Sequence, residues 1–304
     1  TQAIAESWSL DRRAIDRALE AKKEVLRRTG VLEYSPAEHS LDDVAGLDHL
    51  KRWLKRRRAV FEDPKKAAEF GLSAPRGILL LGVPGCGKSL SAKAVAREYG
   101  LPLIRLDPSR LYAKYVGETE ENFRRATQTA EAMAPIVLWI DEIEKGLGPT
   151  GGSNDGGVSQ RVFGSFLSWL QDKKDGVFVI ATSNDVSELP PELLRKGRFD
   201  EIFFVDLPGA DVRRAIFELH LARRGRDPSR FDLDSLVVAA DGFSGSEIEQ
   251  AIVSALYAAY DRGRSLETED IAGELAVTKP LSVTSAESIA QLRSWAKGRA
   301  VSAQ

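Results

Sequence analysis

The sequence predicts an α/β domain built on a parallel sheet, followed by a smaller all-helical unit. Short apolar runs typical of buried strands alternate with stretches of helical periodicity over the first two thirds of the chain. After Pro208 no convincing strand pattern appears. A glycine-rich loop, GVPGCGKS at residues 82–89, follows one strand-like run and precedes a helix-like stretch.

The start of the chain is predicted to be a helical extension and a linker. Residues 1–29 are charged with helix-like apolar spacing, and Gly30 is a typical helix stop. The stretch at 34–40 contains a proline and reads as linker, so we expect residues 1–40 to form this extension. Residues 48–62 then have the pattern of an amphipathic helix.

Five strand-like runs define the predicted sheet. They lie at residues 77–81, 102–107, 136–141, 177–184 and 201–208. Helical stretches separate most of them, which favours a five-stranded parallel sheet in a large domain over residues 41–208. Four later stretches have helical periodicity, at 210–223, 244–261, 266–276 and 284–299. We therefore expect residues 209–304 to form a helical domain that ends in a C-terminal helix.

Composition excludes several classes of protein. The 304 residues carry a net charge of -2, so no global bias toward polyanions is present. The one cysteine, Cys86, excludes an intramolecular disulfide framework and a multi-cysteine zinc cluster. No apolar run approaches the roughly 20 residues of a membrane helix, and from the first residues given we expect no secretory signal. These features predict a soluble, cytoplasmic protein.

GVPGCGKS fits the phosphate-binding pattern GxxxxGK[ST] in the required strand–loop–helix context. Its glycines let backbone N–H groups face phosphate oxygens, and the following helix contributes a favourable dipole. We expect Lys88 to reach the β- and γ-phosphates of ATP and Ser89 to bind Mg²⁺. A chance match on an ordinary turn is the alternative, disfavoured by both flanking elements. The predicted nucleotide-binding residues here are Pro84, Gly85, Cys86, Gly87, Lys88, Ser89 and Leu90.

Polar residues follow two other predicted strands. In IVLWIDE, Asp141 ends an apolar run and can hold Mg²⁺, and Glu142 can activate water as a general base. Helix capping is the alternative role for this pair. Asn184 ends the run at 177–184, where its amide can orient that water; the alternative is a turn-forming asparagine.

Arg195 and Arg198 lie on a short turn before the last predicted strand. We expect that strand to lie far from the phosphate-loop end of the sheet, so neither arginine should reach its own subunit's phosphates. An arginine from a neighbouring subunit would stabilise transition-state charge. The alternative is a solvated basic turn.

These motifs together resemble the AAA branch of the AAA+ ATPases over residues 41–276 at least. The resemblance implies a P-loop αβα sandwich with a helical lid. LDDVAGL resembles the segment that packs on adenine, and GFSGSEIEQA resembles the lid signature beside the nucleotide. The residues so implied are Asp43, Val44, Ala45, Gly245 and Ser246. Lys196 departs from the proline or phenylalanine that is commoner in the family between the two arginines.

Further stretches, including GCGKSLSAKAVAREYGLPLIRLD and PPELLRKGRFDEIFFVDLP, resemble the AAA proteins named as hypothetical chloroplast reading frames. Those proteins occur in plastids, cyanobacteria and other bacteria. The resemblance therefore adds the plastid stroma to the expected locations. It implies an ATPase without specifying what the ATPase acts on.

Tyr115-Val116-Gly117 matches the aromatic–aliphatic–glycine pore loop of AAA unfoldases. The leading hypothesis is thus a Mg²⁺-dependent ATPase ring, expected to be a hexamer, that remodels or threads a protein client. Packing of Tyr115 under its own loop is the alternative for this residue. A nucleotide-gated scaffold that regulates a partner is the second functional hypothesis. The basic run LKRWLKRRR suggests a third, a nucleic-acid translocase, which the net charge disfavours.

Overall fold

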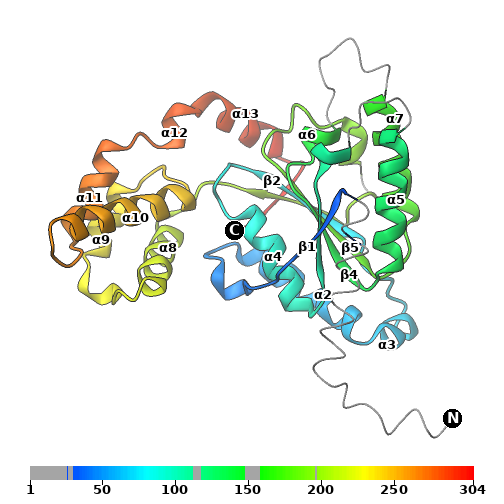
Figure 1. The fold of residues 1–304 in the computed structure, drawn as a ribbon, viewed down its shortest axis with the longest axis horizontal. Coiled ribbons are helices and arrows are strands. Elements are labelled where there is room, and N and C mark those ends of the chain that lie inside the picture. Colours follow the sequence, from blue (N-terminus) through cyan, green and yellow to red (C-terminus); the bar gives the residue numbers. More distant parts are fainter. Residues whose placement is uncertain (1–25, 27–29, 112–117, 148–157, 196) are drawn as a thin grey trace, which may run out of the picture.

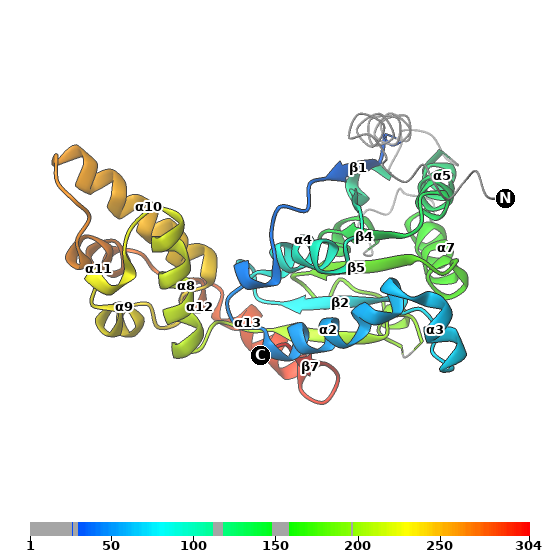
Figure 2. The same cartoon turned by 90° about the horizontal axis from the view of Figure 1, so that it is seen from below.

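The computed structural model describes residues 26, 30–111, 118–147, 158–195 and 197–304 of the chain. It has two parts, a sheet covered by helices and a separate group of helices to one side of it (Figures 1 and 2). The predicted α/β fold class is confirmed. Among the described residues, no helix has the length and apolar character needed to cross a membrane.

The sheet has seven strands in the order β1-β3-β4-β5-β2-β6-β7. All neighbouring pairs are parallel except β1 and β3, which are antiparallel. The strands are β1 (Leu32–Ser35), β2 (Gly77–Gly82), β3 (Leu103–Leu106), β4 (Ile136–Ile140), β5 (Val177–Ser183), β6 (Glu201–Val205) and β7 (Val301–Ser302). The carboxyl ends of β2 to β6 therefore meet at one edge of the sheet.

The five predicted strands are β2 to β6, the contiguous centre of the sheet. The expected count of five is wrong, because β1 and β7 add a strand at each side. The sequence gives little sign of either. β1 is a four-residue run, LEYS, that is mostly only partly buried, and β7 is two exposed residues long. Short edge strands lack the continuous apolar run that marks a central strand.

Two hydrophobic cores lie on opposite faces of the sheet because alternate strand residues point to opposite sides. Leu79 and Leu81 of β2 belong to the core under α5 and α7, and Ile78 and Leu80 belong to the core under α2 and α4. The sheet-covering helices are α2 (Asp48–Glu62), α3 (Pro64–Glu69), α4 (Lys88–Tyr99), α5 (Glu118–Ala132), α6 (Glu144–Leu147) and α7 (Val158–Asp172).

The second part is a helical unit with its own core, centred on Phe217, Leu236 and Ile252. It is built from α8 (Ala210–Arg223), α9 (Leu233–Ala239), α10 (Gly245–Asp261) and α11 (Thr268–Val277). We refer to these four helices as the lid. Pro208 and Gly209 join it to β6.

The end of the chain runs back from the lid to the sheet through α12 (Leu281–Thr284) and α13 (Ala286–Ala296) (Figure 1). Trp295 packs on the core under α5 and α7, and β7 pairs with β6. Buried Ala303 accepts hydrogen bonds at its carbonyl from the first turn of α2. The C-terminal segment thus lies on the large domain, whereas the sequence suggested that all of residues 209–304 belong with the lid.

Candidate active site

The loop after β2 is shaped by glycines that no other residue could replace without movement. Gly85 has φ +74°, and a Cβ atom there would lie 2.1 Å from Oγ of Ser246 in α10. Gly82 has φ +145°, and a Cβ there would lie 1.9 Å from the carbonyl oxygen of Val205. Positive φ and close backbone approach both require glycine. The sequence pattern therefore encodes a loop pressed between β6 and the lid.

Lys88, the first residue of α4, is 6% exposed. Its ammonium donates to the carbonyl oxygens of Gly82 at 2.7 Å and Val83 at 2.8 Å, both in the loop. Burial lowers the pKa of Lys88 to about 8, since removal from water disfavours the charged form. The same loop holds Cys86, and burial raises the pKa of its thiol to about 12. A thiol with this pKa has little thiolate at neutral pH, which argues against a redox role.

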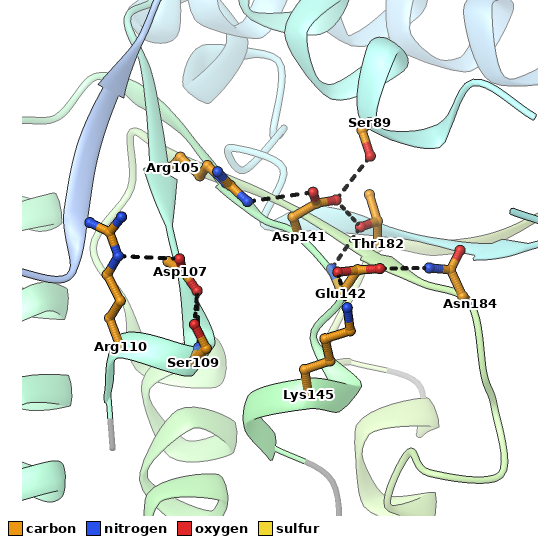
Figure 3. Close-up of polar contacts among 10 residues, drawn as sticks. All are labelled: Ser89, Arg105, Asp107, Ser109, Arg110, Asp141, Glu142, Lys145, Thr182 and Asn184. Carbon is orange, nitrogen blue, oxygen red and sulfur yellow. Dashed lines mark hydrogen bonds and ion pairs between the residues drawn. The ribbon is translucent and has the colours of Figure 1, made fainter. Parts of the chain in front are cut away.

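Asp141 lies directly after β4, where it meets hydroxyl groups from two other elements (Figure 3). Its Oδ1 accepts from Ser89 Oγ at 2.9 Å and from Thr182 Oγ1 at 2.7 Å. Arg105 of β3 lies 3.8 Å from Oδ2. A carboxylate beside a serine hydroxyl fits Mg²⁺, which prefers oxygen ligands and takes its remaining ligands from water and substrate phosphates.

Glu142 has an unusual backbone, with φ +51° for a residue that is not glycine. Its amide donates to Thr182 Oγ1 at 3.0 Å. Its side chain then has a partner on each oxygen: Asn184 Nδ2 donates to Oε1 at 3.2 Å, and Lys145 Nζ lies 2.6 Å from Oε2 (Figure 3). The structure therefore brings Glu142 and Asn184 together from β4 and β5, as the strand-end pattern predicted.

A cavity of about 600 Å³ lies between the sheet edge and the lid. Its lining includes residues from all the predicted nucleotide-site segments: Asp43, Val44, Ala45, Pro84, Gly85, Cys86, Gly87, Lys88, Ser89, Leu90, Asp141, Glu142, Asn184, Gly245 and Ser246. The lid contacts the phosphate loop directly, because Ser246 N donates to the Gly85 carbonyl at 3.0 Å. Segments more than 200 residues apart in sequence thus enclose one space.

The lid is also tied to the segment before α2. Arg223 of α8 lies 2.6 Å from Asp43. The backbone hydrogen bond from Ser40 and the contact with Arg223 lower the pKa of Asp43 to about 2. His220, one turn earlier in α8, lines the same cavity and lies 3.3 Å from Glu249. Burial lowers the pKa of His220, which favours its neutral form.

The two arginines lie outside this cavity's lining. Arg195 is exposed and lines a second cavity of about 1300 Å³, bounded on its other side by α13. Arg198 donates to the Leu167 carbonyl at 2.6 Å and to Gln171 at 2.8 Å. Both residues precede β6 at its amino end, whereas the phosphate loop follows the carboxyl end of β2.

The expectation that β6 lies far from the phosphate-loop end of the sheet is wrong, because β6 pairs directly with β2, the strand that leads into the loop. The separation of the arginines from the phosphates arises from strand direction, since parallel strands put their amino ends at the opposite edge. Tyr115-Val116-Gly117 lie outside the described residues. Their predicted role stays a prediction.

Comparison with known families agrees with this geometry. Residues 78–207 match the model of the ATPase family associated with various cellular activities (AAA). The chain is 42% identical over 302 residues to the AAA domain-containing protein ycf46 of Pyropia yezoensis. The domain over residues 78–207 belongs to the AAA family. Membership implies ATP binding and points to ATPase activity, and the predicted resemblance is confirmed.

Similarity to ycf46 proteins extends well beyond the AAA domain. The Pyropia yezoensis match covers 99% of this chain and 61% of the relative. A ycf46 protein of Guillardia theta is 42% identical over 294 residues, covering 96% of this chain and 58% of the relative. Cell division control protein 48 homolog C of Arabidopsis thaliana is 36% identical over 236 residues, 75% of this chain and 28% of that protein. The chain thus spans about three fifths of the length of the ycf46 relatives.

Several side chains at the AAA site were not anticipated from sequence. Thr182 bridges Asp141 and Glu142, and its place two residues before Asn184 could have suggested it. Lys145 lies only three residues after Glu142, so the chain itself keeps the two side chains close. Arg223 could not have been found, because only the folded lid brings it to Asp43.

Proposed function

We propose that the chain hydrolyses ATP in the cavity between the sheet edge and the lid. The observation that carries this proposal is the meeting of Lys88, Ser89, Asp141, Glu142 and Asn184 from three elements at one edge of the sheet. A phosphate-binding loop alone supports only binding. A carboxylate held by an amide next to a metal-type carboxylate supports hydrolysis.

The proposed roles follow from these positions. Lys88 exchanges its two loop carbonyls for phosphate oxygens, and the backbone N–H groups of the loop bind the remaining charge. Ser89 and Asp141 are the residues that would hold Mg²⁺, which neutralises charge on the phosphates when bound. Glu142 takes the proton of the attacking water, and Asn184 orients the Glu142 carboxylate and the water. Lys145 must release one oxygen of Glu142 for this proton transfer.

Two substitutions separate binding from hydrolysis. Glu142→Gln removes the base and keeps the shape, so ATP binding should persist while phosphate release falls at least about 100-fold. Lys88→Ala should weaken nucleotide binding itself. Equilibrium titration with a fluorescent ATP analogue and steady-state phosphate release measure the two quantities. Unchanged phosphate release by the Glu142→Gln protein would contradict the assignment.

We further propose that the chain works as a ring, expected to be a hexamer, and moves a protein client with Tyr115-Val116-Gly117. The sequence motif and the positions of Arg195 and Arg198 away from their own cavity support this proposal. Tyr115→Ala should leave basal ATP hydrolysis within about twofold and abolish client remodelling. If a Glu142→Gln chain supports full function in cells, the protein is instead a nucleotide-gated scaffold.

A further inference from the structure

The chain just after β4 is joined to the end of β5 by contacts that continue the strand pairing. Ile140 and Ala181 are the last register partners of the two strands. Beyond them, Ile143 N donates to the Thr182 carbonyl at 2.9 Å. One residue beyond Ile143 and two beyond Thr182, Asn184 N donates to Oε1 of Glu144 at 2.9 Å. Glu144 is therefore the outermost contact between the two segments that carry Glu142 and Asn184.

Glu144 is a buried carboxyl group in a place where charge is costly. The residue is 7% exposed, and its Oε2 is buried with no hydrogen-bond partner among the described residues. Burial raises the pKa of Glu144, and the hydrogen bond from Asn184 acts in the opposite direction. A buried acceptor that is only half satisfied destabilises a fold. Capping of α6 by Glu144 would explain little of this burial, because α6 is only four residues long.

The geometry points to a role that justifies this cost. Glu144 fixes the backbone of Asn184, and the side chain of Asn184 reaches back to Glu142 at 3.2 Å. The three residues form a closed link: backbone from Glu142 to Glu144, hydrogen bond to Asn184, and hydrogen bond back to Glu142. A shift of the Asn184 backbone would move its amide away from the proposed base.

We propose that Glu144 is a positioning residue that sets Asn184 against Glu142 for hydrolysis. The inference rests on the proposed ATPase function. Glu144 makes no contact with nucleotide in this scheme, and it is absent from the lining of the nucleotide cavity. It acts through Asn184, so its loss should change the turnover rate and leave nucleotide affinity in place.

Three variants test the link. Glu144→Met keeps the length of the side chain and removes the acceptor, so kcat should fall about tenfold, the equivalent of one lost hydrogen bond to a charged group. Glu144→Gln retains an acceptor oxygen for Asn184 N and should recover kcat to within about threefold. Glu144→Asp withdraws the acceptor by about 1.5 Å and should give an intermediate rate. Nucleotide affinity should stay within about twofold in all three.

The decisive comparison is a double-mutant cycle. In an Asn184→Ala background, Glu144→Met should lower kcat by less than about twofold, because the residue through which it acts is already lost. A general structural role would lower kcat equally in both backgrounds. Equal, multiplicative losses would therefore overturn the proposal, and so would a Glu144→Asp protein with unchanged kcat.

A second readout does not depend on hydrolysis. The amide hydrogen of Asn184 should exchange with solvent at least about tenfold faster in Glu144→Met than in the unmodified protein. Unchanged exchange would overturn the positioning role even in a protein that turns over no ATP. Conversely, faster exchange in a protein whose unmodified form binds ATP and releases no phosphate would retain the link and refute the proposed function.

Discussion

At the residue scale, Lys88 combines burial, charge and a dependence on pH. It is held by two backbone carbonyls, and it has a pKa of about 8. Only the protonated form attracts phosphate. In the free protein the protonated form of Lys88 is therefore nearly complete about one pH unit below the pKa, about half populated at the pKa, and lost as pH rises further.

Nucleotide affinity should therefore depend on pH. Bound phosphate favours the charged amine and raises the pKa of Lys88, so binding above pH 8 requires proton uptake. The affinity for ADP should change little near pH 7, fall by about twofold by pH 8, and then fall by up to about tenfold per pH unit. Calorimetric titration from pH 7 to 9.5 measures it.

The matched control is Lys88→Ala, which should bind weakly and with no break near pH 8. A break of the same size in that variant would assign the titration to another group. His220 is such a group in the same cavity, but its lowered pKa places its titration on the acid side of neutrality.

At the element scale, the central strands were predictable because each is an unbroken run of apolar residues. GILLL and IVLWI are fully buried strands, and an unbroken apolar run is the direct consequence of burial on both faces. The candidate site was predictable once these strands were recognised. Residues that follow neighbouring parallel strands must meet at one edge of the sheet. Lys145 and Thr182 were missed because their roles depend on side-chain packing at that edge.

The C-terminal return was not predictable, because β7 is held by non-local contacts. Ala303 N donates to the Phe204 carbonyl, and its own carbonyl accepts from His49 and Leu50. No local pattern in the last residues encodes these partners.

The basic helix α2 shows the opposite case, because its charge run is visible in the sequence. In the structure, however, Arg57 stacks on Trp53, and Arg58 pairs with Glu62 and Glu98. Cations engaged in this way weaken the nucleic-acid hypothesis.

Two substitutions in the C-terminal strand should differ sharply in effect. Ala303 is fully buried and Val301 is 41% exposed. Ala303→Glu forces a carboxylate into the space between β6 and α2 and should lower the free energy of unfolding by about 2–4 kcal/mol. Val301→Glu should change it by less than about 0.5 kcal/mol. Urea denaturation of both proteins measures the difference. An Ala303→Glu protein as stable as the Val301→Glu protein and the unmodified chain would contradict a stabilising role of the buried Ala303.

At the scale of the whole molecule, the proposed nucleotide cavity lies between the large domain and the lid, which are joined by the chain itself and by side-chain and backbone contacts. The chain crosses from β6 to α8 and returns through α12, and Arg223 pairs with Asp43 across the gap. A nucleotide bound between the sheet and the lid would therefore contact both parts, so its hydrolysis could change the contacts of each. This arrangement suits a machine in which binding and hydrolysis change the angle between large domain and lid.

In the proposed ring, a neighbouring subunit completes the site. Arg198 lies at the amino end of β6 and contacts α7 of its own chain. In a ring, that surface can face the cavity of the next subunit, and an arginine so placed stabilises the transition state. Arg198→Ala should then disable a neighbour's site and leave its own cavity intact.

The measurement that tests this claim most directly is phosphate release by a mixture of two inactive proteins. Lys88→Ala subunits should bind ATP only weakly but retain Arg198, whereas Arg198→Ala subunits should bind ATP but offer no arginine. Mixed in equal amounts after dissociation and reassembly, they should form complete sites at some interfaces and release phosphate several-fold faster than either protein alone. A mixture whose rate equals the mean of its two components would contradict the account.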